Sequence, residues 1–314
     1  MDVDDLVLFE RSLAHATGSH TGPALDAALD DLGWDEALPD DRRAAVSTLF
    51  ELQGAACATS SALDRVMIHA LGMSAEARAA VLPRLGRWGP PGAADRGGAV
   101  HGLATAGFSD HDVAVVVAPA GEKAVAATVA TADLTLRPVH GIDPWLGLVE
   151  VTGAPKHTEI GPADWQAVAM VAQLALGHEL VGASRTMLEL ARKHALERVQ
   201  FGQPISSFQA VRHRLADALV AIETAAAALD AAWLDGSAQS AAMGKALAGR
   251  GARIAARHCQ QVLAGIGFTT EHDLHRFVRR ILVLDELFGS ARSLTRDLGE
   301  CLLVSRRLPP LLPL

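Results

Sequence analysis

The stretch that decides the fold runs from residue 191 to residue 211 and reads ARKHALERVQFGQPISSFQAV. A helix-forming run ends there in cations, a Gly-Gln-Pro turn follows, and a second helical run opens after Ser206 and Ser207. Such a corner suits an anion, because Arg198 is a permanent fork of donors and a helix N-terminus favours negative charge. Phe201 adds a flat face for a ring. A capped helix hairpin with a solvated arginine is the alternative interpretation.

A second motif, QVLAGIGFTTE, occupies residues 261–271. Its glycines let the backbone approach a ligand, and Gln261 carries an amide that can donate a hydrogen bond. The motif follows a helix and not a strand, so it is not a dinucleotide-binding fingerprint. A helix stop with an N-cap at Thr269 or Thr270 explains it equally well.

Helical periodicity surrounds both motifs. Asp164 follows Gly-Pro and is placed to cap a helix that runs to about residue 196. Further helices are predicted over about 208–234 and 237–263, and another after residue 270. The short connections predict antiparallel neighbours in a four-helix bundle, and its alanine-rich faces suit packing against another chain.

The part before the bundle divides into two regions. Apolar residues have helical spacing over residues 5–85, and the RWGPPG stretch at 87–92 interrupts that pattern. The next runs are short and β-rich, and they predict a small antiparallel sheet from strands at 113–117, 125–129, 134–139 and 146–151. We therefore expect a mainly α-helical protein with a small β-domain, divided at residues 1–90, 91–160 and 161–314.

Composition excludes several classes of function. The 28 Lys and Arg residues against 36 Asp and Glu residues give a net charge of −8, which makes nucleic acid an improbable partner. The three cysteines lack metal-site spacing and indicate a reducing, cytoplasmic setting. The acidic N-terminus does not resemble a signal peptide, and no uncharged apolar run of about 18 residues suggests a membrane span.

Three further patterns receive plain structural interpretations. The histidines His272 and His275 have no third ligand at metal-site spacing, so we expect no metal. The HELVG stretch at 178–182 lacks the second histidine of a zinc-protease motif. The arginines at 276, 279 and 280 are interpreted as a solvated, salt-bridged face, with a CoA phosphate or an acidic partner as the less common alternative.

Together, the two motifs resemble the signatures of the acyl-CoA dehydrogenase family, FAD-dependent enzymes that desaturate acyl-CoA thioesters between Cα and Cβ. The similarity covers about residues 164–300 and includes the HRLAD stretch at 213–217. It implies a helical N-terminal domain, a middle β-domain and a C-terminal four-helix bundle that forms the oligomer interface. It implies that Arg198 contacts the FAD diphosphate. It also implies that the cofactor is lined by Gln200, Phe201 and Gln209, and that a neighbouring subunit's FAD meets Gln261 and Gly265.

The catalytic carboxylate of that family has no clear counterpart here. A general base must reach the α-proton while the flavin takes a hydride from the β-carbon. The usual glutamate position holds Phe288, and the alternative position on the first bundle helix falls near Ala172. Glu286 is a weak candidate, because on a helix it lies about 200° around from Phe288. The LATAGFSD stretch at 103–110 also departs from the family motif that holds the flavin ring.

The sequence therefore resembles the base-lacking small subunits of heteromeric acyl-CoA dehydrogenases that act on side chains of steroid-CoA thioesters. This resemblance implies a larger, base-bearing partner chain in a heterotetramer, with the acyl-CoA substrate at the partner's site and an electron-transfer flavoprotein as acceptor. The isolated chain is then expected to show little or no desaturation. Two alternatives stay open: an active homo-oligomer with a relocated base, at Glu286 or elsewhere, and a structural or binding protein without FAD.

Overall fold

The computed structural model describes residues 3–73, 77–93 and 98–306. Its N-terminal region is helical, as the apolar periodicity predicts. The helices there are α1 (Val3–Ser19), α2 (Pro23–Asp31), α3 (Trp34–Asp40), α4 (Arg42–Ala56) and α5 (Ala62–Ala70). Asp41 begins α4 as an N-cap, because its carboxylate accepts the Ala44 N–H at 3.0 Å. The buried Trp34 indole donates to the Ala45 carbonyl at 3.1 Å and so fixes α3 against α4.

The middle region contains two sheets. One has the order β1-β3-β4-β7, with strands β1 (Ala79–Ala80), β3 (Val113–Ala120), β4 (Lys123–Ala130) and β7 (His157–Ala163). The other has the order β2-β6-β5, with strands β2 (Val100–Ala104), β6 (Val149–Gly153) and β5 (Thr135–Pro138). Three short 3-10 helices lie in the connections between these strands, namely η1 (Ala106–Asp110), η2 (Thr131–Asp133) and η3 (Pro144–Leu146).

This arrangement corrects the expectation of a single antiparallel sheet. Strand β1 pairs parallel to β3, and it lies before residue 90, where the sequence predicts only helix. A strand of two residues is too short to show an alternating pattern, so periodicity cannot reveal it. The β3–β4 hairpin has the expected antiparallel register, with Val113 opposite Ala130.

The C-terminal region is a helical bundle joined by short connections. In chain order it contains α6 (Trp165–Glu197), β8 (Val199–Gln200), β9 (Gln203–Pro204), η4 (Ile205–Ser207), α7 (Gln209–Asp235), α8 (Ala238–Leu263), η5 (Ala264–Phe268), α9 (Leu274–Glu286) and α10 (Ala291–Ser305). Side-chain caps set the starts: Asp164 accepts the Ala167 N–H at 3.0 Å and Ser237 accepts the Ser240 N–H at 3.1 Å. The predicted C-terminal bundle of four helices, α6 to α9, is confirmed.

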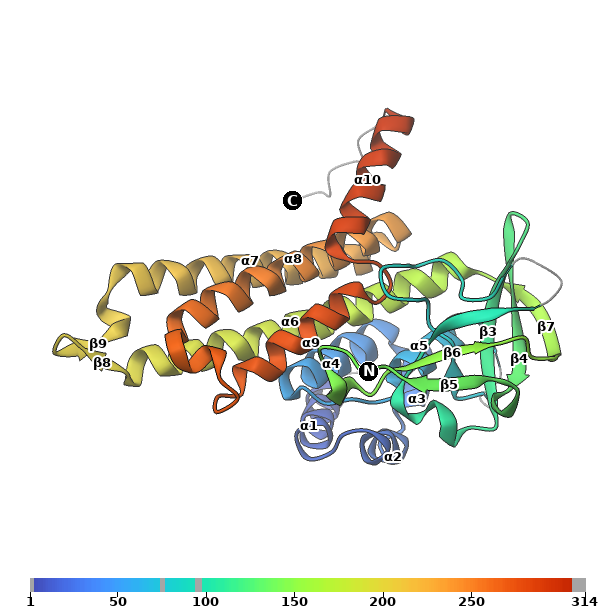
Figure 1. The fold of residues 1–314 in the computed structure, drawn as a ribbon, viewed down its shortest axis with the longest axis horizontal. Helices are drawn as coiled ribbons and strands as arrows, with labels where there is room; N and C mark the ends of the chain where they lie inside the picture. The colour runs from blue at the N-terminus through green and yellow to red at the C-terminus, as the bar shows by residue number, and fades with distance from the viewer. Residues whose placement is uncertain (1–2, 74–76, 94–97, 307–314) are drawn as a thin grey trace.

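The elements form an elongated molecule (Figure 1). The two sheets lie at one end, the β8–β9 hairpin at the other, and the N-terminal helices lie along α6 between them, while α10 projects from the bundle. Helix α6 is long and apolar enough to cross a membrane by composition, but 83% of its most apolar window is buried inside the protein. It is therefore the core helix of this fold.

Two glycines bring α4 and α6 into close contact. A Cβ added at Gly182 would overlap the carbonyl of Glu51, and one added at Gly54 would overlap the carbonyl of Glu179. Near this crossing, the Glu51 carboxylate contacts Nδ1 of His178 at 3.0 Å, and the Trp233 indole donates to Nε2 of the same ring at 3.0 Å. The N-terminal region is thus fixed to α6 by backbone proximity and a buried polar link.

Candidate functional site

The first sequence motif forms a solvent-exposed hairpin between α6 and α7. Helix α6 ends at Glu197, and the Ile205 N–H donates to the Arg198 carbonyl at 2.8 Å to close the corner. The hairpin tip is formed by Phe201, whose φ is 54°, and Gly202, whose φ is 79°. A left-handed phenylalanine is uncommon, and its ring is 92% exposed. The ring meets Phe208 edge-on at a centroid distance of 6.1 Å, and its outer face is open.

The six predicted cofactor residues are all exposed, and they come from two segments at one end of the bundle. The hairpin and the α8–α9 connection lie at the same end of the molecule (Figure 1). The pKa of His194, near the end of α6, is lowered by burial and then by the nearby charges of His272 and Arg198. Since His272 follows the second motif, the structure brings the two motifs together. The exposed residues are Arg198, Gln200, Phe201, Gln209, Gln261 and Gly265.

The glycines of the second motif serve different purposes. A Cβ at Gly267 would lie 2.9 Å from the Leu263 Cβ, so this glycine lets the chain fold back on the end of α8. A Cβ at Gly265 would touch nothing within 4 Å, so its backbone faces open space. Gly265 therefore leaves room for another molecule to approach, and Gly267 is needed for packing.

These residues fit one wall of a flavin nucleotide site. The Arg198 guanidinium forms no ion pair with any residue that the structure describes, so it is available to a diphosphate. The glutamine amides can donate or accept at ribose and ring atoms, and the Phe201 ring can cover a flat heterocycle. All these groups face solvent in the single chain.

The two positions expected for a catalytic base meet in space and hold no carboxylate. Phe288 is fully buried, with φ at 53°, and its ring stacks on Trp165 at a centroid distance of 6.0 Å. Its carbonyl accepts a hydrogen bond from Nε2 of Gln173 at 3.1 Å. Gln173 follows Ala172, the predicted alternative position on the first bundle helix. The two predicted base positions therefore hold a phenyl ring and a methyl group, with an amide beside them.

A buried lysine holds the turn that carries Phe288. The Lys245 ammonium donates to the carbonyls of Leu284 and Asp285 at 3.0 Å each, and to that of Gly289 at 3.4 Å. Burial lowers its pKa to about 8. These contacts satisfy carbonyls at the C-terminus of α9, so the turn between α9 and α10 is rigidly positioned.

Glu286 lies apart from Phe288. Its carboxylate is 3.8 Å from the Arg253 guanidinium, and its side chain is 39% exposed on the side of α9 that faces α8. Its backbone carbonyl accepts the Gly86 N–H at 2.8 Å. The geometry therefore directs Glu286 toward an arginine and solvent.

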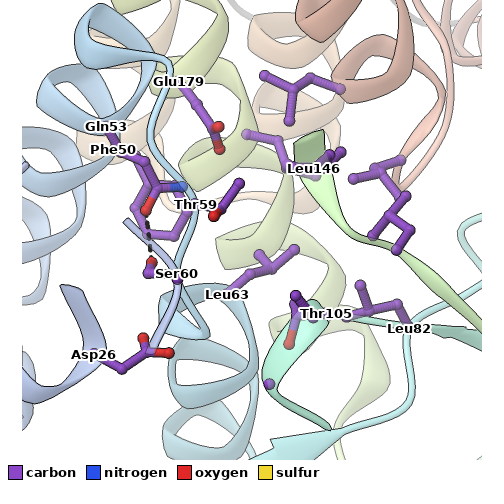
Figure 2. Close-up of a pocket in the computed structure, with 17 residues that line it drawn as sticks. Asp26, Phe50, Gln53, Thr59, Ser60, Leu63, Leu82, Thr105, Leu146 and Glu179 are labelled. Atoms are coloured by element: carbon purple, nitrogen blue, oxygen red, sulfur yellow. Dashed lines mark hydrogen bonds between the residues drawn. The ribbon is translucent and has the colours of Figure 1, made fainter. Parts of the chain in front are cut away.

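A small cavity of about 40 Å³ lies where the three regions of the chain meet (Figure 2). Glu179 of α6 and Thr105 of the β-region line it, and nearby the Ser60 hydroxyl donates to Gln53 at 2.6 Å. Ligand pockets for molecules of drug size are about 300–1,000 Å³, whereas a space of this size holds a few waters. The cavity has no room for an acyl thioester in this conformation.

The expectation that Arg280 belongs to a solvated face is wrong. Its guanidinium is fully buried, donates to Asp143 at 2.6 Å and to the Ala58 carbonyl at 2.7 Å, and lies 3.5 Å from Glu179. Burial raises the pKa of Glu179 to about 6, and the charge of Arg280 opposes that rise. No motif reveals this cluster, because its members come from distant parts of the sequence.

A second buried carboxyl joins α5 to the sheets and gives a pH prediction. Burial raises the pKa of Asp64 from 3.8 to about 8, although the Thr105 hydroxyl donates to it at 2.9 Å. Because the folded pKa is the higher one, stability from this group is fully present below pH 4 and is lost as the pH rises toward 8. We expect Asp64→Asn to remove most of this decline, measured as the difference in unfolding free energy between pH 5 and pH 8. An unchanged pH dependence in Asp64→Asn would contradict the assignment.

Comparison with known proteins agrees with this geometry. Residues 166–303 match the family described as "Acyl-CoA dehydrogenase, C-terminal domain". The acyl-CoA dehydrogenase IpdE2 of Mycolicibacterium smegmatis is 34% identical over 135 residues, which is 43% of this chain and 43% of that protein. The matching part thus spans less than half the length of that relative.

Two solved structures share the fold along nearly the whole chain. A variant of the steroid ACAD Tcur3481-Tcur3483 has a TM-score of 0.80 at 19% identity, covering 96% of this chain and 99% of that one. The ChsE4-ChsE5 complex from Mycobacterium tuberculosis has a TM-score of 0.79 at 20% identity, covering 99% of each chain. The likeness extends to the N-terminal helices and the sheets, beyond the helical region that the sequence motifs identify.

Proposed function

Because residues 166–303 match the C-terminal domain of the acyl-CoA dehydrogenase family, we propose that the chain is the base-lacking subunit of a heteromeric acyl-CoA dehydrogenase. In this role it completes an FAD site together with a larger, base-bearing chain. The acyl-CoA substrate binds at that partner's site, where the α,β-desaturation takes place. One of the two similar structures is a steroid ACAD and the other is the ChsE4-ChsE5 complex, and these likenesses support a steroid-CoA substrate and a heterotetramer.

The observation that carries the proposal is the occupation of both base positions by groups that cannot take a proton. Phe288 fills one position and Ala172 the other, and Gln173, next to Ala172, donates to the Phe288 carbonyl at 3.1 Å. A general base has to reach the reacting proton directly or through one water. The closed cavity and the Arg280 pairs beside it also favour a chain whose own acyl pocket is lost.

This chain's residues have binding roles in the proposed assembly. When bound, FAD supplies the hydride acceptor for the β-carbon. Arg198 holds the diphosphate, while Gln200, Phe201 and Gln209 line the nucleotide on the hairpin side. Gln261 and the open backbone at Gly265 contact it from the α8–α9 connection. The proposed electron acceptor of the assembly is an electron-transfer flavoprotein, and the proposed location is the cytoplasm.

The alternatives receive less support from the geometry. An active homo-oligomer needs a relocated base, but the Glu286 carboxylate faces Arg253, and Glu179 is beside the buried Arg280 in a cavity of about 40 Å³. A binding protein without FAD leaves unexplained why Arg198 is unpaired among the described residues and why the Phe201 ring is almost fully exposed.

Co-expression with a candidate larger subunit tests the proposal. We expect the purified complex to contain one flavin for every two chains and to desaturate acyl-CoA, while this chain alone shows little or no turnover. Arg198→Gln should reduce the flavin content of the complex, since it removes the charge-assisted bonds to the diphosphate. Arg192→Gln is the matched control, because Arg192 lies in α6 shortly before Arg198 and pairs only with Glu189 in the described contacts, at 2.7 Å.

Three outcomes would contradict the proposal. Robust desaturation by the isolated chain would indicate a base of its own. A complex without flavin absorbance would favour the binding protein. Equal flavin content in Arg198→Gln and Arg192→Gln would remove Arg198 from the cofactor site.

A further inference from the structure

An open groove lies between α10 and the N-terminal turns of α6 and α8. Its volume is about 380 Å³. On the α10 side it is lined by Leu294, Leu298 and Cys301, which are four and three residues apart and therefore share one face of the helix. Ala169 of α6 and Ala242 of α8 line the opposite side with small apolar groups. Figure 1 shows α10 projecting from the bundle, so the groove runs beside a helix that is only partly packed.

Two tryptophans give the groove an aromatic wall. Trp88 and Trp165 both line it, and the Trp165 indole donates to the Trp88 carbonyl at 2.8 Å. The Trp165 ring also stacks on the buried Phe288 at a centroid distance of 6.0 Å. A Cβ added at Gly289 would lie 2.9 Å from the Trp88 ring, so this ring rests directly on the turn before α10. The aromatic wall is therefore held in place, and the groove is preformed.

The groove carries little charge. Among the described residues that line it, Asp297 is the only one with an acidic or strongly basic side chain. Gln166 and Gln239 line it as well and are exposed, so their amides can form hydrogen bonds with a backbone that lies across the groove. This surface suits an uncharged, extended peptide segment with apolar side chains.

The chain contains such a segment directly after α10. Residues 307–314 read RLPPLLPL, and after Arg307 they include no charged side chain. Proline fixes φ and favours the extended polyproline II helix, which has no internal backbone hydrogen bonds. Residues 310–313 form a Pro-x-x-Pro sequence, and segments of this type are recognised by aromatic-lined grooves.

The groove is within reach of this segment. Helix α10 ends at Ser305, and Arg306 follows it with φ at 52°, a left-handed cap that turns the chain away from the helix axis. At 1.5 Å per helical residue, Cys301 lies about 6 Å and Leu294 about 16 Å back from the end of α10. Residues 307–314 span about 25 Å as a polyproline II helix, so they can cover the groove along this whole face.

We propose that residues 307–314 bind in this groove, with leucine and proline side chains against Trp88 and Trp165. Binding buries apolar surface on both sides, which is favourable in water. A separate protein that offers a similar segment is a weaker competitor, because a short connection gives the chain's own segment an effective concentration in the millimolar range. The inference does not depend on the proposed flavin site.

The native cysteines provide the test. Cys301 is exposed and lines the groove, whereas Cys57 and Cys259 are buried, so a thiol reagent such as DTNB reacts first with Cys301 in the folded protein. We expect Cys301 of the full chain to react at least about tenfold more slowly than in a variant that lacks residues 307–314, because the bound segment covers the thiol.

Added peptide and one substitution make the test specific. The peptide RLPPLLPL should restore protection in the shortened variant, and a peptide with alanine for each proline should protect more weakly, since its extended conformation is no longer preformed. In the full chain, Leu298→Glu should remove the protection, because a carboxylate in the groove opposes an apolar segment. Leu303→Glu is the matched control: Leu303 is also on α10, is 78% exposed and does not line the groove.

The proposal is overturned if the full and shortened chains react at equal rates, if the peptide gives no protection, or if Leu303→Glu removes protection as fully as Leu298→Glu. Protection that increases with the concentration of the full chain would assign the groove to a second copy and would also overturn it. Thermal unfolding checks the fold of each variant. The peptide experiment leaves the groove itself unchanged, so it decides the question even where Leu298→Glu does not fold.

Discussion

Replacing Arg280 by methionine should lower the free energy of unfolding by about 3–5 kcal/mol. The guanidinium is fully buried and connects Asp143 of the β-region, the Ala58 carbonyl of the N-terminal region and Glu179 of the bundle. Methionine keeps the apolar stem but leaves two buried carboxylates without their counter-ion. Those carboxylates then have to take up protons or admit water, and either response destabilises the contact between the three regions.

Urea unfolding followed by circular dichroism measures this effect. Arg279→Met is the matched control on the same helix, because Arg279 is only half-buried and has no described ion pair; it should change stability by less than about 1 kcal/mol. Combining Arg280→Met with Glu179→Gln should recover part of the loss, since one stranded charge is removed. Equal stabilities of wild type and Arg280→Met would show that the buried pairs contribute nothing to holding the regions together.

Gly182→Ala should be severely destabilising, although alanine is normally the better helix former. The added methyl would overlap the Glu51 carbonyl of α4, and a backbone atom cannot move aside as a side chain can. The two helices would have to separate, which opens gaps in a closely packed core and weakens the Glu51–His178 contact of 3.0 Å. We expect a loss of about 3 kcal/mol or more, at the upper end of what overpacking costs.

Gly299→Ala is the same chemical change, but we expect it to raise the stability of the protein. Gly299 lies inside α10, and a Cβ there would meet nothing within 4 Å. Alanine should therefore stabilise the helix by about 0.5–1 kcal/mol through propensity alone. Thermal unfolding of the two variants side by side separates backbone contact from helix propensity. A stable Gly182→Ala variant would show that α4 and α6 are not as close as described.

Local signals predicted the bundle well. Side-chain caps at Asp164 and Ser237 act within a few residues, so the starts of α6 and α8 can be located from sequence. Strand β1 escaped prediction because its two residues are recognisable only through their pairing with β3. The close glycine at position 182 looks the same in sequence as the open glycine at position 299, since only the approach of another helix distinguishes them.

The candidate site also has some residues that the sequence predicts and others that it does not. The exposed residues around Arg198 form contiguous motifs, so a family resemblance identifies them, and the structure adds that the two motifs share one end of the bundle. The burial of Arg280 depends on Ala58, Asp143 and Glu179, which are far apart in sequence. A charged triplet on a helix gives no sign of such partners, so the usual preference of arginine for the surface led to the wrong expectation.

The lysine-held turn between α9 and α10 bears on whether the loss of the proton acceptor can be reversed. Lys245 fixes the main chain at Gly289, Gln173 fixes it at Phe288, and Trp165 covers the ring. Mutating the phenylalanine codon back to one for glutamate would place a carboxylate in a sealed apolar slot, where it would stay neutral and meet no thioester. Reversion would need several changes at once, so the proposed division of labour between two polypeptides would be hard to reverse in evolution.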